Sequence, residues 1–261
     1  MRVLTWNINS LRLRLPLLEQ VVKACAPDII CLQETKVEDA LFPLEAVKTL
    51  GFDDVAFRGM KSYNGVMIAA NRSFQTHPHL NWVGQDDARH LWVSFDNGVE
   101  LHNFYVPAGG DEPDPILNPK YQHKLQFLEE MTAWFEGNRT DSHSIILVGD
   151  LNIAPLEHDV WSHRQLMNVV SHTQPELERL QTLQNSIKFT DMMRKFVPEH
   201  EKLYSWWSYR GRDWQKSDRG RRLDHIWASG NIAKQAKNMQ VLKEFRGVER
   251  PSDHAPVFVD F

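Results

Sequence analysis

The sequence predicts an α+β fold, a four-layer α/β/β/α sandwich of two packed mixed sheets with helices outside. Two observations support this prediction. Short apolar runs that stop at a glycine or a polar residue recur along the chain, which is typical of buried strands. The two halves also share one order: a strand, a helix and a second strand, followed by hairpins. Two such sheets can bury one face against each other and the other face under helices.

Two stretches carry the apolar period of amphipathic helices. Residues 13–25 repeat leucine and valine on one helical face and stop before Pro27, and residues 121–135 lead into a strand at 144–148. Shorter helices are predicted at 176–184 and 189–196, and further strands at 64–71, 90–95, 100–106, 223–228, 239–242 and 257–261. No linker or low-complexity segment divides these elements, so a single domain spanning residues 1–261 is expected.

Composition favours a compact cytoplasmic protein. A chain of 261 residues with 42% hydrophobic residues can bury a substantial core. The net charge of −4 means that any affinity for nucleic acid must come from a local basic surface. Neither the apolar segment of a signal peptide nor a run of about 18 apolar residues is present, so we expect no secretion and no membrane span. Cys25 and Cys31 are expected to be buried, reduced thiols.

Short acidic and amide motifs close several of the predicted strands. Asn7 and Asn9 close the first strand, Glu34 the second, and Asp150 with Asn152 the strand at 144–148. Residues two apart on a strand share a face, so each pair is expected to point the same way. Strands that each end in a carboxylate, an amide or an imidazole would assemble one polar site at the rim of the sandwich. Such a site is typical of a metal-assisted hydrolase.

These residue types suit the hydrolysis of a phosphodiester, which needs charge neutralisation, an activated water and help for the leaving oxygen. Mg²⁺ prefers hard oxygen ligands and keeps several waters, so Glu34 with one further carboxylate suffices to hold it. Asp150 is a candidate general base beside an oxyanion-binding amide, Asn152. Closing a turn after the strand is the alternative role for Asn7 and Asn9.

Two later motifs predict a histidine–carboxylate pair. Arg-Leu-Asp-His supplies Asp224 and His225, and Ser-Asp-His-Ala-Pro supplies Asp253 and His254. Asp224 is the predicted partner of His254, because a hydrogen-bonded carboxylate raises the pKa of an imidazole and fixes its tautomer. The protonated His254 could then donate to a phosphate oxygen. His225 is expected to face the other side of the sheet and to serve in packing.

Residues 206–222 form the most basic segment and interleave aromatic residues with six Arg or Lys residues against two Asp. Such a segment offers phosphate contacts together with flat faces for a sugar or base. The alternative is a solvated basic loop in which Trp206 and Trp207 belong to the core. The candidate nucleic-acid contacts from this segment are Trp206, Arg210, Arg212, Lys216 and Arg221.

In their order and over residues 3–261, these motifs resemble those of the exonuclease III family within the endonuclease/exonuclease/phosphatase fold. The resemblance implies a DNA-repair phosphodiesterase that depends on Mg²⁺, with Mn²⁺ able to substitute, and that works as a monomer. Its implied substrates are double-stranded DNA with nicks, 3′ blocking groups or abasic sites, and its activities are 3′→5′ exonuclease, 3′ unblocking and incision 5′ to an abasic site. The implied roles are catalytic for Tyr105, Asp150, Asn152, Asp224, Asp253 and His254, metal-binding for Glu34, Asn7 and Asp253, and DNA-binding for Asn9 and Asn64 as well as the basic segment.

The chain departs from the family at several positions. Asn9 stands where some relatives carry Asp, Thr173 stands where many abasic-site members carry an aromatic residue, and two further departures bear on specificity. His172 stands where many abasic-site members carry a small residue, and Arg221 stands where some eukaryotic relatives carry Trp. An abasic sugar must swing out of the helix into a dry pocket, and an imidazole projecting into that pocket would leave less room. His172 is therefore a predicted specificity residue, and 3′-end processing is expected to exceed abasic-site incision.

Two other functions remain open at this stage. One is a phosphodiesterase or phosphatase of the same fold that acts on lipid or inositol substrates, and the basic aromatic segment argues against it. The other is a catalytically inactive DNA-binding module. That function would require the loss of Glu34, Asp150 or His254, and all three are present.

Overall fold

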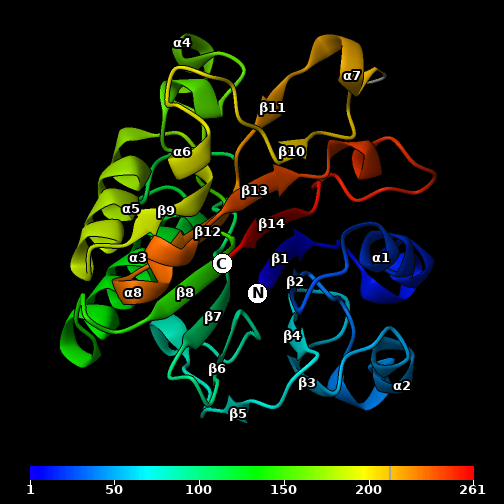
Figure 1. The fold of residues 1–261 in the computed structure, drawn as a ribbon. Helices are drawn as coiled ribbons and strands as arrows, with labels where there is room; N and C mark the ends of the chain where they lie inside the picture. The colour runs from blue at the N-terminus through cyan, green and yellow to red at the C-terminus, as the bar shows by residue number, and fades with distance from the viewer. Residues whose placement is uncertain (212) are drawn as a thin grey trace.

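The computed structural model describes residues 1–211 and 213–261 and has the predicted four layers (Figure 1). The first sheet has the order β13-β14-β1-β2-β4-β3 and the second the order β5-β6-β7-β8-β12-β9. The first sheet consists of β1 (Arg2–Asn7), β2 (Ile29–Gln33), β3 (Asp54–Arg58), β4 (Val66–Ala70), β13 (Asn238–Val241) and β14 (Val257–Asp260). The second consists of β5 (Gln75–Thr76), β6 (His90–Ser94), β7 (Glu100–Tyr105), β8 (Ile145–Asp150), β9 (Thr190–Asp191) and β12 (Asp224–Ala228).

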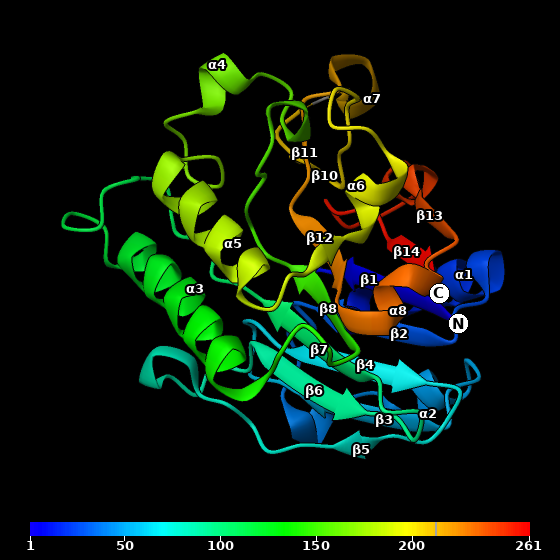
Figure 2. The same cartoon turned by 60° about the vertical axis from the view of Figure 1, so that its left-hand side comes forward.

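Helices cover the outer face of each sheet. The first sheet carries α1 (Leu11–Cys25) and α2 (Leu44–Lys48), and the second carries α3 (Pro119–Asn138) and α5 (Gln174–Ser186), which lie side by side (Figure 2). The other α-helices are α4 (His163–Leu166), α6 (Met192–Phe196), α7 (Trp214–Ser217) and α8 (Gly230–Gln235), and β10 (Trp206–Trp207) and β11 (Gly220–Arg221) form a two-stranded sheet.

The side chains of each strand point alternately to the two faces of its sheet, so each strand contributes to two layers of the core. In β1, Val3 belongs to the core between the sheets, whereas Leu4 and Trp6 pack under the helices of the first sheet. In β8, Val148 belongs to the inter-sheet core and Leu147 packs under α3 and α5. Side chains two residues apart share a face, so the inward-facing row of each strand runs on to its polar end.

A buried amide network joins the two sheets just behind these strand ends. The side-chain nitrogen of Gln33 in β2 donates to Thr5 Oγ1 at 2.9 Å and to Asn103 Oδ1 of β7 at 2.7 Å. Asn103 in turn donates back to the carbonyls of Leu32 and Met67, each at 2.9 Å. Polar groups paired across an apolar core fix one relative placement of the sheets.

The predicted α+β sandwich is confirmed, and one predicted helix differs. Residues 189–196 were predicted to be one helix, but they begin as β9, which pairs with β12. Asp191 then caps α6 by accepting from the backbone nitrogens of Met193 and Arg194. Both cysteines are buried and free, as predicted. Within residues 1–211 and 213–261, no helix is long and apolar enough to cross a membrane.

Candidate active site

The inward-facing rows of four strands end at one rim of the sandwich. β1 runs parallel to β2 and β7 runs parallel to β8, so the ends of each pair lie together. β12 runs antiparallel to β8, and its first residue, Asp224, lies directly opposite the last residue of β8, Asp150. A cavity of about 920 Å³ opens at this rim, and its lining includes Glu34, Tyr105, Asp150, Asn152, Asp253 and His254.

Glu34 turns into the cavity because its backbone takes a left-handed conformation (φ 52°) immediately after β2. Its Oε1 accepts from Asn7 Nδ2 at 2.9 Å and from the Tyr105 hydroxyl at 2.8 Å, and its Oε2 pairs with Lys36 Nζ at 2.6 Å. Burial tends to raise the pKa of Glu34, but these hydrogen bonds and the Lys36 charge lower it below its usual value. Glu34 is therefore a charged carboxylate at the cavity surface.

Asn7 connects carboxylates of the two sheets. Its Nδ2 donates both to Glu34 Oε1 and to Asp150 Oδ2, the latter at 2.8 Å, while its Oδ1 accepts from the backbone of Asn9. In this arrangement the amide holds two negative side chains apart and its oxygen is already engaged. The geometry therefore favours a supporting role for Asn7 over direct metal ligation.

Asn9 reaches the site from beyond the strand. β1 ends at Asn7 and Asn9 is left-handed (φ 48°), so the prediction that the two amides share a strand face is wrong. Asn9 Nδ2 donates to Asp253 Oδ1 at 3.1 Å, and Lys36 Nζ donates to Asn9 Oδ1 at 2.7 Å. The other oxygen of Asp253 accepts from Trp206 Nε1 at 2.9 Å.

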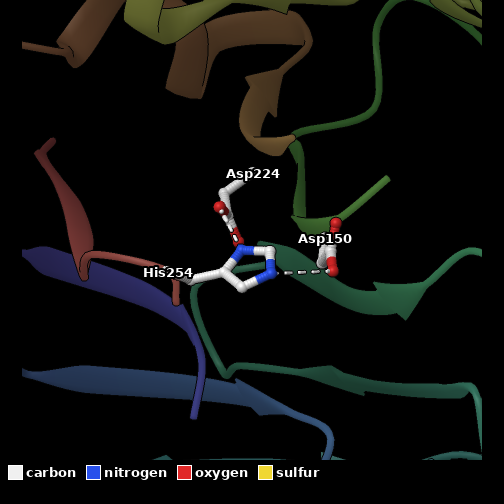
Figure 3. A group of neighbouring side chains, drawn as sticks. All are labelled: Asp150, Asp224 and His254. Atoms are coloured by element: carbon white, nitrogen blue, oxygen red, sulfur yellow. Dashed lines mark hydrogen bonds and ion pairs between the residues drawn. The ribbon is translucent and has the colours of Figure 1, made fainter. Parts of the chain in front are cut away.

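His254 lies between two carboxylates (Figure 3). Its Nδ1 is 2.8 Å from Asp224 Oδ2, and its Nε2 is 3.6 Å from Asp150 Oδ2. Burial alone would lower the pKa of His254, but the charges of Asp224 and Asp150 raise it well above its usual value. Two like charges directly opposite each other across a sheet repel. The His254 imidazolium offsets that repulsion, and its pairing with Asp224 is the contact that the sequence predicted.

Asp150, Asp224 and His254 also form a group of potential metal ligands, because their ligand atoms lie within 4.8 Å of one another. Among the described residues, no other group of three such side chains lies this close together. The hydrogen bond from His254 Nδ1 to Asp224 and the raised pKa of His254 favour an imidazolium, which has no free lone pair for a cation. The carboxylates at the cavity surface, Glu34 and Asp253, suit a cation better.

Asp150 is almost fully buried at the end of β8. Burial raises its pKa, and the nearby positive charge of His254 offsets only part of that rise. A carboxylate with raised proton affinity is suited to accept a proton from water. The Tyr105 hydroxyl stays protonated, because burial and the neighbouring carboxylates raise its pKa.

Asn152 is held by its backbone beside Asp150. Its backbone nitrogen donates to Asp150 Oδ1 at 3.0 Å, its Nδ2 donates to the Val106 carbonyl at 2.9 Å, and its own carbonyl accepts from Lys124 Nζ at 2.8 Å. Because Asn152 is left-handed (φ 54°) and lies beyond β8, the expected sharing of a strand face with Asp150 is wrong.

A short ladder of strands forms one wall of the cavity. Trp206 pairs with Arg221 across β10 and β11, and isolated bridges connect Trp206 to His254 and Arg221 to Val160. Directly opposed residues of antiparallel strands project to the same face. His254, Trp206 and Arg221 therefore form a row along the wall, and the Arg221 guanidinium lies 5.5 Å from the centre of the Trp206 ring.

The other predicted DNA contacts lie at or outside this cavity. Arg210 is exposed and lines the cavity. Lys216 is exposed on α7, and Asn64 donates to the Asp87 carbonyl in a separate loop. Neither Lys216 nor Asn64 lines the cavity. Arg212 lies outside the described residues. Trp207 is buried, as the alternative interpretation of the segment expected.

The predicted placement of His172 is wrong. Its ring is buried, hydrogen-bonded to the Ala154 carbonyl at 2.5 Å and to His163 Nδ1 at 2.8 Å, and it does not line the cavity. The left-handed Ser171 (φ 87°) turns the chain so that Val170 and Ser171 face the cavity in its place.

The sequence interpretation also missed a buried ion pair behind this loop. Lys124 of α3 and Glu176 of α5 are fully buried, with Lys124 Nζ 2.5 Å from Glu176 Oε1. Thr173-Gln174-Pro175-Glu176 is a capping box, which places Glu176 at the start of α5, but nothing in the sequence marks Lys124 as its partner.

Two packed sheets with a carboxylate–imidazolium site at their shared rim suit the hydrolysis of a phosphodiester. This chain belongs to the Endonuclease/Exonuclease/phosphatase family, which it matches over residues 4–254. It is 28% identical to Exodeoxyribonuclease III of Haemophilus influenzae over 100% of both chains. It is therefore an enzyme of the exonuclease III family, a metal-dependent group of DNA-repair nucleases.

Two solved structures have the same fold. An AP endonuclease from Archaeoglobus fulgidus superimposes with a TM-score of 0.93 at 31% identity, covering 100% of this chain and 99% of that one. A 3′ phosphatase from Neisseria bound to a product DNA hairpin gives a TM-score of 0.91 at 32% identity, with the same coverage.

Proposed function

We propose that this protein, acting as one domain over residues 1–261, hydrolyses phosphate esters at 3′ ends, nicks and abasic sites of double-stranded DNA. The observation that carries the proposal is the Asp150–His254–Asp224 line at the end of a cavity walled by Trp206 and Arg221. Cation and aromatic side chains beside a hydrolytic site match the phosphates and the flat bases of DNA. A monomer in the cytoplasm is part of the proposal.

Each residue of the site has its own role in the proposed reaction. Asp150 accepts a proton from water as its oxygen adds to phosphorus, and the bond from phosphorus to the 3′ oxygen breaks. The protonated His254, oriented by Asp224, donates to a non-bridging oxygen, where negative charge develops. Asn152 has a second amide N–H beside the one donated to Val106, and Tyr105 would have to turn its hydroxyl proton from Glu34 to reach a phosphate oxygen at the same surface. The proposed DNA contacts are Trp206, Arg210 and Arg221 in the cavity lining, with Asn9, Asn64 and Lys216 outside it. Arg212 is also a proposed contact, from the sequence alone, because it lies outside the described residues.

The donor set fits Mg²⁺. Glu34, Asp150 and Asp253 place three carboxylates in the cavity lining, and Asp224 lies buried behind His254. His254 and Lys36 are the cations in contact with these carboxylates. Glu34 and Asp253 offer hard oxygens at the cavity surface, with Asn7 in support, and Mn²⁺ accepts the same ligands. When bound, the cation would neutralise charge on the phosphate and on the departing oxygen.

A panel of labelled duplexes tests the proposal. The panel contains a blunt end, a nick with a 3′-phosphate, an abasic site and an intact closed duplex, each with Mg²⁺, with Mn²⁺ and with a chelator. We expect turnover of the first three substrates only with a metal, and none of the closed duplex. His254→Asn is the matched inactive control. Hydrolysis of an inositol phosphate or phospholipid without hydrolysis of any duplex would favour the alternative phosphodiesterase.

The balance between 3′-end processing and abasic-site incision is a separate proposal. With His172 buried elsewhere, the side chain in the wall that departs from the family is Arg221. A guanidinium beside Trp206 occupies space that an extruded, uncharged sugar would need. We therefore expect faster removal of a 3′-phosphate than incision at an abasic site, measured as kcat/KM in the same panel.

A further inference from the structure

Arg221 is a cation in the cavity wall for which the described residues provide no carboxylate partner. Its Nη1 donates to the Val170 carbonyl at 3.2 Å and to Ser171 Oγ at 2.6 Å, both of which are neutral acceptors. Its Nε is buried without a hydrogen-bond partner among the described residues. Burial of the side chain lowers the pKa of Arg221, and only the charge of Glu176, which is ion-paired with Lys124, acts in the opposite direction. A largely buried cation without a carboxylate in direct contact is costly to maintain.

The guanidinium is held by a rigid support. Ser171 donates its backbone nitrogen to both oxygens of Glu176, at 3.0 and 2.9 Å. Glu176 is fully buried and ion-paired with Lys124, so the loop that anchors Arg221 is fixed to two helices at once. A donor held in this way binds its ligand with little further ordering. The fixed position of Arg221 is therefore more typical of a binding residue than of a solvent-exposed surface charge.

The position of Arg221 relies on the strand ladder. Trp206 separates it from His254, and adjacent strands are about 4.8 Å apart, so the two backbones are roughly 10 Å apart. The long Arg221 side chain lies along the Trp206 ring. Its guanidinium thus stands beside, and not on, the phosphate that His254 would contact.

We propose that Arg221, supported by Ser171, forms an anion-binding subsite for a charged group carried beyond the reacting phosphate of a 3′ DNA end. The proposal rests on the proposed function and names its preferred substrate class. One source of the charge is a 3′-phosphate esterified to glycolic acid, whose carboxylate matches the planar guanidinium fork. The other source is a terminal nucleotide that itself bears a 3′-phosphate.

Hydrolysis of the glycolate ester is balanced with water alone. The oxygen of water adds to phosphorus and loses one proton to Asp150, the bond between phosphorus and the 3′ oxygen of the DNA breaks, and that oxygen takes up a proton. The products are a 3′-hydroxyl end and phosphoglycolate, whose carboxylate remains at Arg221 until release. No oxidant or further reactant is needed.

The test compares matched duplexes that differ only beyond the reacting phosphate. In the first pair, one duplex carries glycolate (anionic) and the other a 2-hydroxyethyl group (neutral and similar in size). The second pair ends in a nucleotide with or without a 3′-phosphate, and cleavage of its last internucleotide bond is followed. Wild type should favour the anionic member of each pair by roughly tenfold or more in kcat/KM, the range of one charge-assisted hydrogen-bonded pair.

Arg221→Met keeps much of the side-chain length and should reduce that preference to near unity, whereas Arg221→Lys should retain part of it. Arg219→Gln is the matched control, because Arg219 lines the same cavity but is exposed and stacks on Trp161 at 4.6 Å. It should lower kcat/KM for both members of a pair by the same factor. Thermal unfolding of each variant checks that the loop at Ser171 remains folded.

Three outcomes separate the possibilities. A preference limited to glycolate ends identifies the carboxylate as the ligand, and one limited to nucleotide 3′-phosphates identifies the phosphate. Equal kcat/KM for anionic and neutral ends in wild type, or an equal loss on both ends in a folded Arg221→Met, overturns the subsite and leaves the proposed function intact. Absence of hydrolysis on every DNA end would instead overturn the proposed function.

Discussion

His254 depends on its two carboxylate neighbours for both its charge and its orientation. Asp224 binds Nδ1 at 2.8 Å, and Asp150 lies 3.6 Å from Nε2. We expect His254→Asn and Asp224→Asn each to lower kcat by about 10²–10⁴-fold, the range of positioned acid–base groups. The double variant should lose little more, because residues that act as a unit are not additive. Steady-state kinetics on the 3′-phosphate nick give all four rates, and additive losses in log kcat would show that the two side chains act independently.

Single residues also mark the limit of what the sequence could predict. Motif order predicted which side chains meet, including the contact between Asp224 and His254. It did not predict their directions, because left-handed residues at Asn9, Asn152 and Ser171 redirect the chain just beyond regular structure. Asparagine tolerates that conformation better than most residues, so two of these turns left a weak signal. Nothing comparable marked Ser171, and the prediction for His172 was wrong as a result.

At the scale of elements, α3 and α5 are joined by the buried pair of Lys124 and Glu176. The three protons of the ammonium face Glu176 and the carbonyls of Asn152 and Ala108, the last at 3.3 Å. We expect Lys124→Met to cost roughly 3–5 kcal/mol of unfolding free energy, since it leaves a buried carboxylate without its cation. It should also lower kcat, because Asn152 loses its support.

Urea unfolding of Lys124→Met, Glu176→Gln and the double variant tests this prediction. The double variant should lose less than the sum of the single losses, because it leaves no isolated buried charge. Lys23→Met is the matched control, since Lys23 pairs with Glu19 at 2.6 Å on the exposed face of α1 and should change little. A loss at Lys124 no larger than that at Lys23 would contradict a supporting role for the buried pair.

Elements were predictable in proportion to their periodicity. The helices at 13–25 and 121–135 carry several turns of one apolar face, and both are present as α1 and α3. Residues 189–196 carry fewer signals, and the pairing of Thr190 and Asp191 with β12 overrides their local helical preference. β3 was not predicted, although Val55 and Phe57 alternate with smaller or polar residues in it.

On the scale of the whole molecule, the site exists only when both sheets are in place. Glu34 comes from the first sheet, Asp150 from the second, and Asn7 bridges them. The order of strands that achieves this could not be predicted from local patterns, because β1 lies between β2 and β14 near the opposite end of the chain. Long-range pairing is set by the burial of whole faces, which local patterns do not show, and the strand order was therefore not predicted.

Asn7→Asp tests whether a neutral side chain is needed between the carboxylates of Glu34 and Asp150 when no metal is bound. The substitution replaces an amide donor to two carboxylates with a third carboxylate at a fully buried position. Without metal, we expect the unfolding free energy to fall by roughly 3–5 kcal/mol, the range for an uncompensated buried charge. A ligand that binds only the folded state stabilises it by mass action, so Mg²⁺ should restore more stability in Asn7→Asp than it adds to wild type.

Asn7→Ala, which loses the same hydrogen bonds without adding a charge, should be destabilised but show no enhanced response to Mg²⁺. Urea unfolding at a series of Mg²⁺ concentrations gives the dependence of the unfolding free energy on Mg²⁺ for wild type, Asn7→Asp and Asn7→Ala. The same dependence in all three proteins would mean that the metal does not bind at the junction of the two sheets.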